Sequence, residues 1–272
     1  MRIVSLFLAL ALGPSGLPAT EATPFKFAVL GDWGTGLDSS QRVADKMCKW
    51  RDDHPFDDVI TAGDNIYPEG AAEDFQSNFL DPFSCLLDAG VLWHSTLGNH
   101  DVVTDDGQSE LDEPAFGFDG RNYVLRMSGV RFVMFNSNKV RRKWLRRSLR
   151  AEDGDRWTIV VFHHPVFSPG PHGSTSGFSD WMPRLFKRRG VDLVLNGHDH
   201  LYAVTKPLNK IRYVVTGGGG ASKYDCHPEW FTAKCKERHH FLYVKAGEDE
   251  IKVRAVPPKG PPFHTFVTTG RA

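Results

Sequence analysis

The sequence lacks several features that would assign a protein to a class at once. Its 272 residues include only 4 cysteines, too few for a small fold held together by disulfides. The 33 lysines and arginines equal the 33 aspartates and glutamates, so net charge gives no reason to expect nucleic acid or an anionic membrane as the main partner. With 40% hydrophobic residues, the chain is too apolar for a disordered protein and long enough to bury a large core.

Long apolar runs are also scarce, and the one run that stands out lies at the N-terminus. A positive residue is followed by an apolar stretch over residues 3–12 and then by glycine and proline. This order is typical of a secretory signal peptide, and the run is shorter than the roughly 20 residues that a membrane span needs. We therefore expect a signal peptide over residues 1–22, cleaved near Ala22, and a single catalytic domain over residues 23–272.

A signal peptide implies a secreted protein, extracellular or endolysosomal–vacuolar, with no membrane anchor, and it permits disulfides. Cys226 and Cys235 are close in sequence within a polar stretch and could close a loop. Cys48 and Cys85 fall on expected helices and could pair or remain buried thiols. Four cysteines allow three pairings, and the sequence does not choose among them.

Five apolar segments share one plan, in which a short strand runs into a polar loop. These strands are expected at residues 25–30, 58–62, 91–97, 157–162 and 191–196. Their near-continuous apolar character is typical of strands covered on both faces. Helical periodicity lies between them, at residues 38–49, 73–87, 142–149 and 180–189. The alternation predicts an α/β layered fold with its polar loops at the carboxyl edge of the strands.

After residue 202 the pattern changes to hairpin-like strands, expected at residues 211–216, 241–246 and 250–256. Such strands predict a mixed sheet, or a second sheet packed on the first. The proline-rich stretch 257–262 is expected to form a trailing loop, because proline cannot donate to a sheet ladder.

The five loops offer oxygen and imidazole side chains and no cysteine. In chain order these are Asp32, Asp64, Tyr67, Asn99, His100, His163, His164, His198 and His200. Such a donor set suits a site for Fe, Mn or Zn. It is not the donor set of a structural zinc site, which is built from cysteine thiolates. A single aspartate after a strand is more often a helix cap, and a lone histidine is more often a structural residue. Five such loops on successive strands instead indicate a metal centre.

The ordered motifs resemble the metallophosphoesterase superfamily and, within it, the small tartrate-resistant type of purple acid phosphatase. The family pattern is D-x-G, G-D-x-x-Y, G-N-H-D/E, V-x-x-H and G-H-x-H. This chain carries it at residues 32–34, 63–67, 98–101, 160–163 and 197–200. Tyr67 is the most selective residue, since related phosphoesterases generally lack a metal-bound tyrosine there. The resemblance implies a four-layer αββα sandwich of two mixed β-sheets flanked by helices.

The resemblance also implies a binuclear centre of Fe(III) and a divalent Fe, Zn or Mn ion. The ferric ligands would be Asp32, Tyr67 and His200. The ligands of the divalent ion would be Asn99, His163 and His198, with Asp64 bridging both ions. Hard anionic oxygens favour the ferric ion, whereas an amide and two imidazoles suit a divalent one. A metal-bound hydroxide would serve as the nucleophile at phosphorus.

Three further histidines are candidates for catalysis. By resemblance, His100 faces the substrate phosphate, with Asp101 placed to orient it. His172 lies nine residues after His163, near the offset at which small purple phosphatases carry a histidine that binds substrate or protonates the leaving group. For His164, a structural role and a substrate contact are equally open.

Together with the expected signal peptide, the resemblance implies a secreted, monomeric acid phosphatase that hydrolyses small phosphate monoesters, with no nucleic acid as partner. One alternative is a phosphodiesterase or nucleotidase on the same metal site. The other is a secreted iron protein with a mainly redox role.

Three biased stretches are interpreted structurally. The run 139–150 holds seven lysines and arginines and is expected to form a solvated helix face, with an anion or nucleic-acid patch as the alternative. The glycine-rich stretch 216–221 lacks the Lys-Ser/Thr of a P-loop, so close backbone packing near the site is favoured over direct phosphate contact. The acidic stretch 105–113 is expected to be a surface loop near the pocket.

Overall fold

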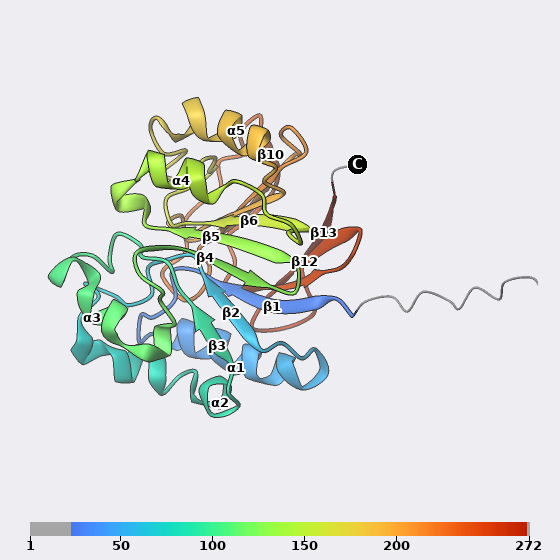
Figure 1. Ribbon diagram of the computed structural model, residues 1–272. Coiled ribbons are helices and arrows are strands. Elements are labelled where there is room, and N and C mark those ends of the chain that lie inside the picture. Colours follow the sequence, from blue (N-terminus) through green and yellow to red (C-terminus); the bar gives the residue numbers. More distant parts are fainter. Residues whose placement is uncertain (1–22, 271–272) are drawn as a thin grey trace, which may run out of the picture.

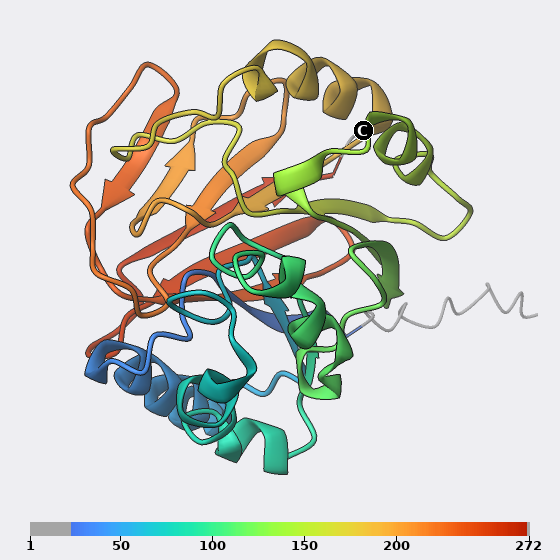
Figure 2. The ribbon, with the colours of Figure 1, turned by 90° about the vertical axis from the view of Figure 1, so that its left-hand side faces the viewer.

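Two mixed β-sheets packed face to face form the centre of the protein (Figure 1). The structure is a computed structural model that describes residues 23–270, so the expected signal peptide over residues 1–22 lies outside the described part. Helices cover the outer faces of the pair. Figure 2 shows α1 (Asp38–Asp53) and α2 (Ser84–Asp88) below the sheets and α5 (Phe178–Arg189) above them. The four-layer αββα sandwich is therefore confirmed.

The first sheet has six strands, in the spatial order β13 (His264–Thr269), β12 (Glu250–Val256), β11 (Phe241–Ala246), β1 (Phe25–Leu30), β2 (Asp58–Thr61) and β3 (Leu92–His94). The second has seven, in the order β10 (Thr232–Lys236), β8 (Tyr202–Thr205), β9 (Arg212–Thr216), β7 (Leu193–Asn196), β6 (Trp157–Val161), β5 (Val130–Phe135) and β4 (Asn122–Met127). The remaining helices are α3 (Gln108–Asp112) and α4 (Arg142–Ser148).

Strand β1 shows why its sequence is apolar at successive positions. Phe27 and Val29 point between the two sheets and belong to the core that both sheets share. Ala28 and Leu30 point the other way, into the layer packed under α1. Because both faces of the strand are buried, hydrophobic residues do not alternate with polar ones.

Parallel pairing brings the strand ends together. β1, β2 and β3 run parallel in the first sheet, and β5, β6, β7 and β9 run parallel in the second. The carboxyl ends of parallel neighbours lie at the same edge of a sheet, which is where ligand sites form in α/β folds. The polar loops predicted from the sequence follow these strands.

The main strand-level differences from the sequence predictions are strands with at least one antiparallel neighbour. Strands β4, β5, β8, β10 and β13 were not predicted. β4 and β5 form a hairpin whose turn residues Ser128 and Gly129 have φ of 48° and 78°, the positive angles of a tight hairpin turn. The stretch 257–262 is a loop, but the expectation that it trails away is wrong, since β13 follows it and pairs with β12.

The single helix expected over residues 73–87 is also wrong. The segment forms a short 3-10 turn at Ala72–Asp74, a π-type turn at Gln76–Leu80 and then α2. Pro82 lies between the last two, and proline removes one backbone donor and clashes with the preceding helical turn.

Both pairs of cysteines form disulfides. Cys48 on α1 is bonded to Cys85 on α2, which ties together two helices on the same face of the first sheet. Cys226 is bonded to Cys235 on β10 and closes a short surface loop. Within residues 23–270, no helix has both the length and the apolar character needed to cross a membrane.

The two disulfides should differ in their effect on stability. The Cys48–Cys85 bond spans 37 residues of sequence and the Cys226–Cys235 bond spans 9, and a longer closed loop restricts the unfolded chain more. The double variant C48A/C85A is expected to lose roughly 3–4 kcal/mol of unfolding free energy in denaturant titrations, and C226A/C235A roughly 2–3 kcal/mol. An equal loss, or the reverse order, would contradict this account.

Candidate metal centre

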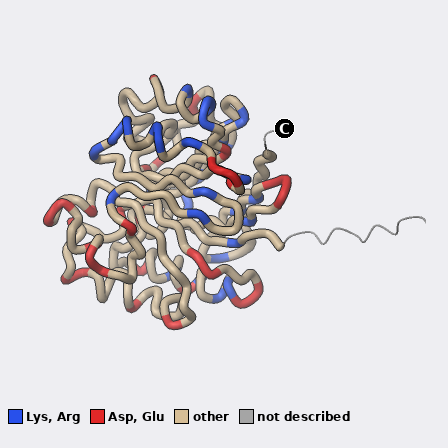
Figure 3. Tube along the Cα trace, viewed as in Figure 1, with Lys and Arg blue, Asp and Glu red and all other residues tan. Residues whose placement is uncertain are grey.

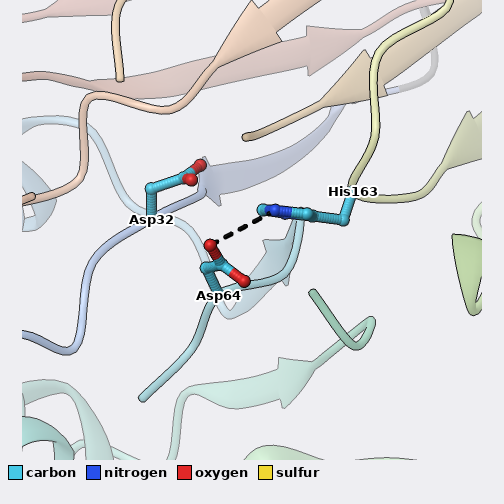
Figure 4. A group of neighbouring side chains, drawn as sticks. All are labelled: Asp32, Asp64 and His163. Carbon is cyan, nitrogen blue, oxygen red and sulfur yellow. Dashed lines mark ion pairs between the residues drawn. The ribbon is translucent and has the colours of Figure 1, made fainter. Parts of the chain in front are cut away.

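The carboxylates of Asp32 and Asp64 and the imidazole of His163 point toward one another at the carboxyl ends of β1, β2 and β6 (Figure 4). One ligand atom from each of the three lies within 4.8 Å of the others. All three side chains are buried, and they come from both sheets. The centre therefore lies where the two sheets meet.

Asp64 lies in the middle of a larger group. The Tyr67 hydroxyl is 3.0 Å from Asp64 Oδ2 and 3.4 Å from Asp32 Oδ1, and it lies 3.1 Å from His200 Nε2. On the opposite side, His163 Nε2 is 3.3 Å from the same Asp64 oxygen. One carboxylate oxygen thus contacts both the tyrosine side and the histidine side of the group.

The second side of the group is built around Asn99. Its Oδ1 lies 3.0 Å from His163 Nε2 and 2.9 Å from His198 Nδ1. The His198 backbone N–H donates to both oxygens of Asp32 at 3.0 Å, which links this side to the first. The structure therefore brings all seven side chains predicted as metal ligands into one cluster.

Unusual backbone angles aim these side chains. Asp32, Asp64 and His198 have φ of 57°, 49° and 74°, in the left-handed region that few residues other than glycine occupy. A side chain at Gly98 would overlap the backbone nitrogen and carboxylate of Asp64, so glycine permits the close approach of these two loops. Such backbone strain is typical of functional sites.

The glycine-rich stretch 216–221 packs closely against this centre, as its sequence was interpreted. A Cβ at Gly219 would lie 2.5 Å from the Gly31 carbonyl oxygen and 2.5 Å from Trp33 Cβ. The Gly219 N–H donates to the Gly31 oxygen at 2.9 Å. The stretch thus supports the loop that begins at Asp32.

Two histidines have their tautomers fixed by carbonyl groups. His163 Nδ1 donates to the Ala62 oxygen at 2.9 Å, and His200 Nδ1 donates to the Ser222 oxygen at 2.8 Å. A carbonyl only accepts, so each neutral ring leaves the lone pair of Nε2 facing the cluster. Metal-binding histidines are usually oriented by such bonds.

The buried carboxylates and acceptor atoms of the cluster are suited to binding a cation. In a neutral His163 ring, the Nε2 lone pair faces acceptor oxygens of Asp64 and Asn99, an arrangement that needs a proton or a metal ion between them. Burial lowers the pKa of His163, but the Asp64 carboxylate outweighs burial and raises the pKa to about 9. Burial raises the pKa of Asp32 well above its usual range, and Asp64 adds to the effect. The donor types and the excess of buried acceptors suit bound metal ions.

His172 and Asp199 form a pair beside the cluster. His172 Nδ1 donates to Asp199 Oδ1 at 3.0 Å, and the Asp199 carboxylate also accepts from the Ser168 hydroxyl. The His172 side chain is 45% exposed, whereas that of Asp199 is fully buried. The ring centre of His172 lies 4.4 Å from that of His198. Asp199, the variable residue of the G-H-x-H motif, was not singled out from the sequence.

His164 is largely buried next to His198, with ring centres 4.7 Å apart. Its Nδ1 lies 2.8 Å from the Ser137 hydroxyl, whose oxygen also accepts from the His164 backbone N–H at 3.1 Å. Burial, with the positive charge of His163 adding to the effect, lowers the pKa of His164 to about 4. The ring is therefore neutral over most of the pH range.

His100 lies at the edge of the cluster, but Asp101 does not orient it as expected. His100 Nδ1 instead donates to the Pro68 carbonyl oxygen at 2.6 Å, and the His100 backbone N–H donates to Asp64 Oδ1 at 2.9 Å. The Asp101 carboxylate accepts the backbone N–H groups of Asn65 and Gly98, both at 2.7 Å. Asp101 therefore joins the two loops that carry Asp64 and His100.

A buried carboxyl group completes this network. Glu110 is fully buried in α3, so the expectation that residues 105–113 form only a surface loop is wrong. Asn65 Nδ2 donates to Glu110 Oε2 and to Asp101 Oδ2, each at 3.0 Å. The other carboxyl oxygen, Glu110 Oε1, is buried and makes no hydrogen bond within residues 23–270. Burial raises the pKa of Glu110 well above its usual range, and the Asp101 charge adds to the effect. A proton on Glu110 lets this carboxyl group donate to Asp101.

Tyr224 is a further residue that the sequence did not reveal. Its ring stacks on that of His200, with centres 4.1 Å apart and planes 11° apart. Its backbone N–H donates to the His200 carbonyl oxygen at 3.1 Å. Tyr224 thus packs on the face of the predicted ligand His200, whose Nε2 atom meets the Tyr67 hydroxyl. None of the motifs found in the sequence includes this position.

Residues 25–202 match the family described as calcineurin-like phosphoesterase. The chain belongs to this family. The match covers all five strand-end motifs, and it confirms the metallophosphoesterase resemblance and the expectation of a phosphoesterase enzyme.

Curated relatives place this calcineurin-like phosphoesterase near the purple acid phosphatases, as predicted. It is 28% identical to Purple acid phosphatase 17 of Arabidopsis thaliana, over 93% of this chain and 86% of that protein. It is 24% identical to tartrate-resistant acid phosphatase type 5 of Rattus norvegicus, over 88% of each chain.

Solved structures share the fold. GAP50, the anchor in the inner membrane complex of Plasmodium, matches with a TM-score of 0.77 and 18% identity, over 92% of this chain and 90% of that chain. Purple acid phosphatase PPD1 from yellow lupin (Lupinus luteus) seeds also matches with a TM-score of 0.77, at 16% identity, over 92% of this chain and 54% of that chain.

Substitutions at Glu110 should show whether it is protonated in the folded protein. Folding raises the pKa of Glu110, so the folded protein keeps a proton that the unfolded chain loses above about pH 4.5. The contribution of Glu110 to the unfolding free energy therefore falls as pH rises. Glu110→Gln is expected to match or exceed the parent in unfolding free energy at pH 8 and to lose less stability than the parent between pH 5 and pH 8.

Glu110→Ala is the matched control, because it leaves Asn65 and Asp101 without their partner. It is expected to lose about 1–3 kcal/mol at both pH values. If Glu110→Gln were as damaging as Glu110→Ala at pH 8, the residue would be ionised in the folded state.

Proposed function

We propose that this phosphoesterase is a secreted acid phosphatase that hydrolyses small phosphate monoesters at a binuclear centre of Fe(III) and a divalent Fe, Zn or Mn ion. One observation carries the proposal: a single oxygen of Asp64 contacts both Tyr67 and His163, the two sides of a complete ligand set. The names of the curated relatives support the reaction class.

The residues divide between the two ions by their chemistry. Asp32, Tyr67 and His200 would hold the ferric ion, and Asn99, His163 and His198 the divalent ion, with Asp64 between them. Burial raises the pKa of Tyr67 well above its usual range, and both aspartates add to the effect, so only a strongly polarising ion favours the tyrosinate. When bound, the two ions would polarise a phosphoryl oxygen and lower the pKa of a water molecule.

His172 is placed to protonate the leaving group. Its Nδ1–H is committed to Asp199, so a second proton would sit on Nε2 of the half-exposed ring. The buried Asp199 carboxylate holds the ring in this orientation. At acidic pH, His172 would give the Nε2 proton to the departing alkoxide oxygen.

His100 would contact the phosphate. Its Nδ1–H is held by Pro68, which leaves Nε2 to carry a proton and donate to a phosphoryl oxygen. His164 is better suited to a supporting role, because it is neutral and its ring is fixed between Ser137 and His198. Removal of its ring would change the position of His198 rather than a proton transfer.

Export, a single domain over residues 23–272 and a monomeric state belong to the same proposal. The two disulfides support passage through an oxidising compartment. N-terminal sequencing of the protein from the medium of a secreting host should find cleavage near Ala22.

The metal content and colour of the purified protein test the ligand assignment. The parent is expected to contain iron plus one further ion per chain and to show a visible tyrosinate charge-transfer band. Tyr67→Phe should keep the fold by circular dichroism but lose the band. Iron present without the band in the parent, or a band that survives in Tyr67→Phe, would rule out Tyr67 as a ligand.

Activity tests separate the monoesterase from the alternatives. We expect p-nitrophenyl phosphate to be hydrolysed faster than bis-p-nitrophenyl phosphate at acidic pH, and chelation of the metals to abolish both activities. Preference for the diester would favour a phosphodiesterase. Peroxide-driven radical formation that persists when phosphatase activity is blocked, with no hydrolysis of either ester, would favour a redox protein.

The acid role of His172 predicts a dependence on the leaving group. His172→Ala should lower kcat roughly 100-fold or more for an alkyl phosphate, whose leaving group needs a proton, and far less for p-nitrophenyl phosphate. Asp199→Asn should show the same selectivity in a weaker form. Equal losses on both substrates would count against proton transfer by His172.

A further inference from the structure

A second group of basic side chains lies outside the metal centre. Four segments meet around a depression of about 380 Å³, and its lining contains five basic residues and two prolines but no aspartate or glutamate. These lining residues are Arg42, Lys223, Arg238, His239, Pro257, Pro258 and Lys259. We call this depression the basic pocket.

The four strong cations of the basic pocket are exposed and unpaired. Within residues 23–270, no ion pair joins Arg42, Lys223, Arg238 or Lys259 to an acidic side chain. Glu237, next to Arg238 in sequence, is not part of the lining and accepts the Cys226 backbone N–H at 3.0 Å. Like charges are thus held together with no neutralising carboxylate in the lining, an arrangement that costs energy unless an anion binds.

Two side chains of the basic pocket are held by hydrogen bonds to backbone carbonyl groups. Arg238 Nη2 donates to the Lys259 carbonyl oxygen at 3.2 Å, and its guanidinium lies 5.4 Å from the centre of the Phe263 ring. His239 Nε2 donates to the Ala221 carbonyl oxygen at 3.0 Å. Burial lowers the pKa of His239, and the charges of Lys223 and Arg42 lower it further, as expected where positive charge accumulates.

We propose that the basic pocket binds a compact polyanion, a small molecule that carries several phosphate groups. Four cations exceed what one phosphate dianion needs, and guanidinium groups match phosphate oxygens in geometry. The volume lies in the range of roughly 300–1,000 Å³ that is usual for small-molecule sites. This site does not depend on the reaction proposed above.

The basic pocket shares a backbone segment with the metal centre. The Ala221 N–H donates to the Asp32 carbonyl oxygen at 3.1 Å, and its own carbonyl group accepts from His239 of the pocket. The next residue, Ser222, fixes the ring of His200, and Lys223 then enters the pocket. A polyanion that binds Lys223 would therefore restrain the segment that holds Asp32 and His200.

Binding of inositol hexakissulfate tests the proposal, because its sulfate esters carry the charge of a polyphosphate without offering a phosphate ester to the metal centre. The pocket variant is R42Q/K223Q, which neutralises two exposed side chains that have no role in the proposed chemistry. The control is R146Q/R147Q on α4, where exposed lysines and arginines also gather (Figure 3) and where the same net charge is removed.

By isothermal calorimetry at physiological salt, the parent is expected to bind one inositol hexakissulfate per chain. Loss of two charge-assisted contacts should raise the dissociation constant of R42Q/K223Q by about tenfold or more, and that of R146Q/R147Q by less than about twofold. Hydrogen exchange should slow on binding at residues 221–224, where the Tyr224 N–H donates to the His200 oxygen.

Three results would overturn the proposal. They are no binding by the parent, equal weakening in both variants, and slowed exchange on α4 rather than at residues 221–224. Circular dichroism and thermal unfolding of both variants confirm that the fold is kept. Because the assay does not measure phosphatase activity, failure here leaves the proposed reaction unaffected, and failure of the reaction leaves this site unaffected.

Discussion

The contact of Asp64 with Tyr67 on one side and His163 on the other is the interaction on which the rest of the site depends. It joins a loop of the first β-sheet to a loop of the second, at the carboxyl ends of β2 and β6. The buried Asp101 carboxylate fixes the loop of Asp64 to the loop of Asn99 and His100. The four-layer fold therefore brings five separate loops into one cluster, with Asp64 in contact with both sides of it.

This arrangement opposes stability in the isolated chain. Buried carboxylates and imidazoles cost solvation energy, and three residues of the site adopt left-handed backbone angles. The surroundings offset these costs with the Asn65–Asp101–Glu110 network, the close packing of the glycine-rich stretch and the disulfide between α1 and α2. Bound metal ions would offset the remaining charge, so metal binding and folding stability should be linked.

The sequence predicted the parts of the molecule whose signals are local. Strands such as β1 are recognisable because both faces are buried, and motifs such as Gly197–His200 lie directly after them. Strand β13 was missed because the proline-rich stretch before it was interpreted as a trailing loop, and β10 was missed because it takes its place only through pairing with a distant segment. Glu110 and Tyr224 were missed for the same reason: their roles depend on contacts across 45 and 24 residues of sequence, with Asn65 and His200 respectively.

The central claim is that Asp64 lies between two metal ions. Anomalous diffraction from crystals of the purified protein, recorded at the iron absorption edge and at that of the second metal found by elemental analysis, tests it most directly. Two peaks are expected, one on either side of the Asp64 carboxylate, the first bordered by Tyr67 and the second by Asn99. A single peak, or two peaks that Asp64 does not separate, would contradict the claim.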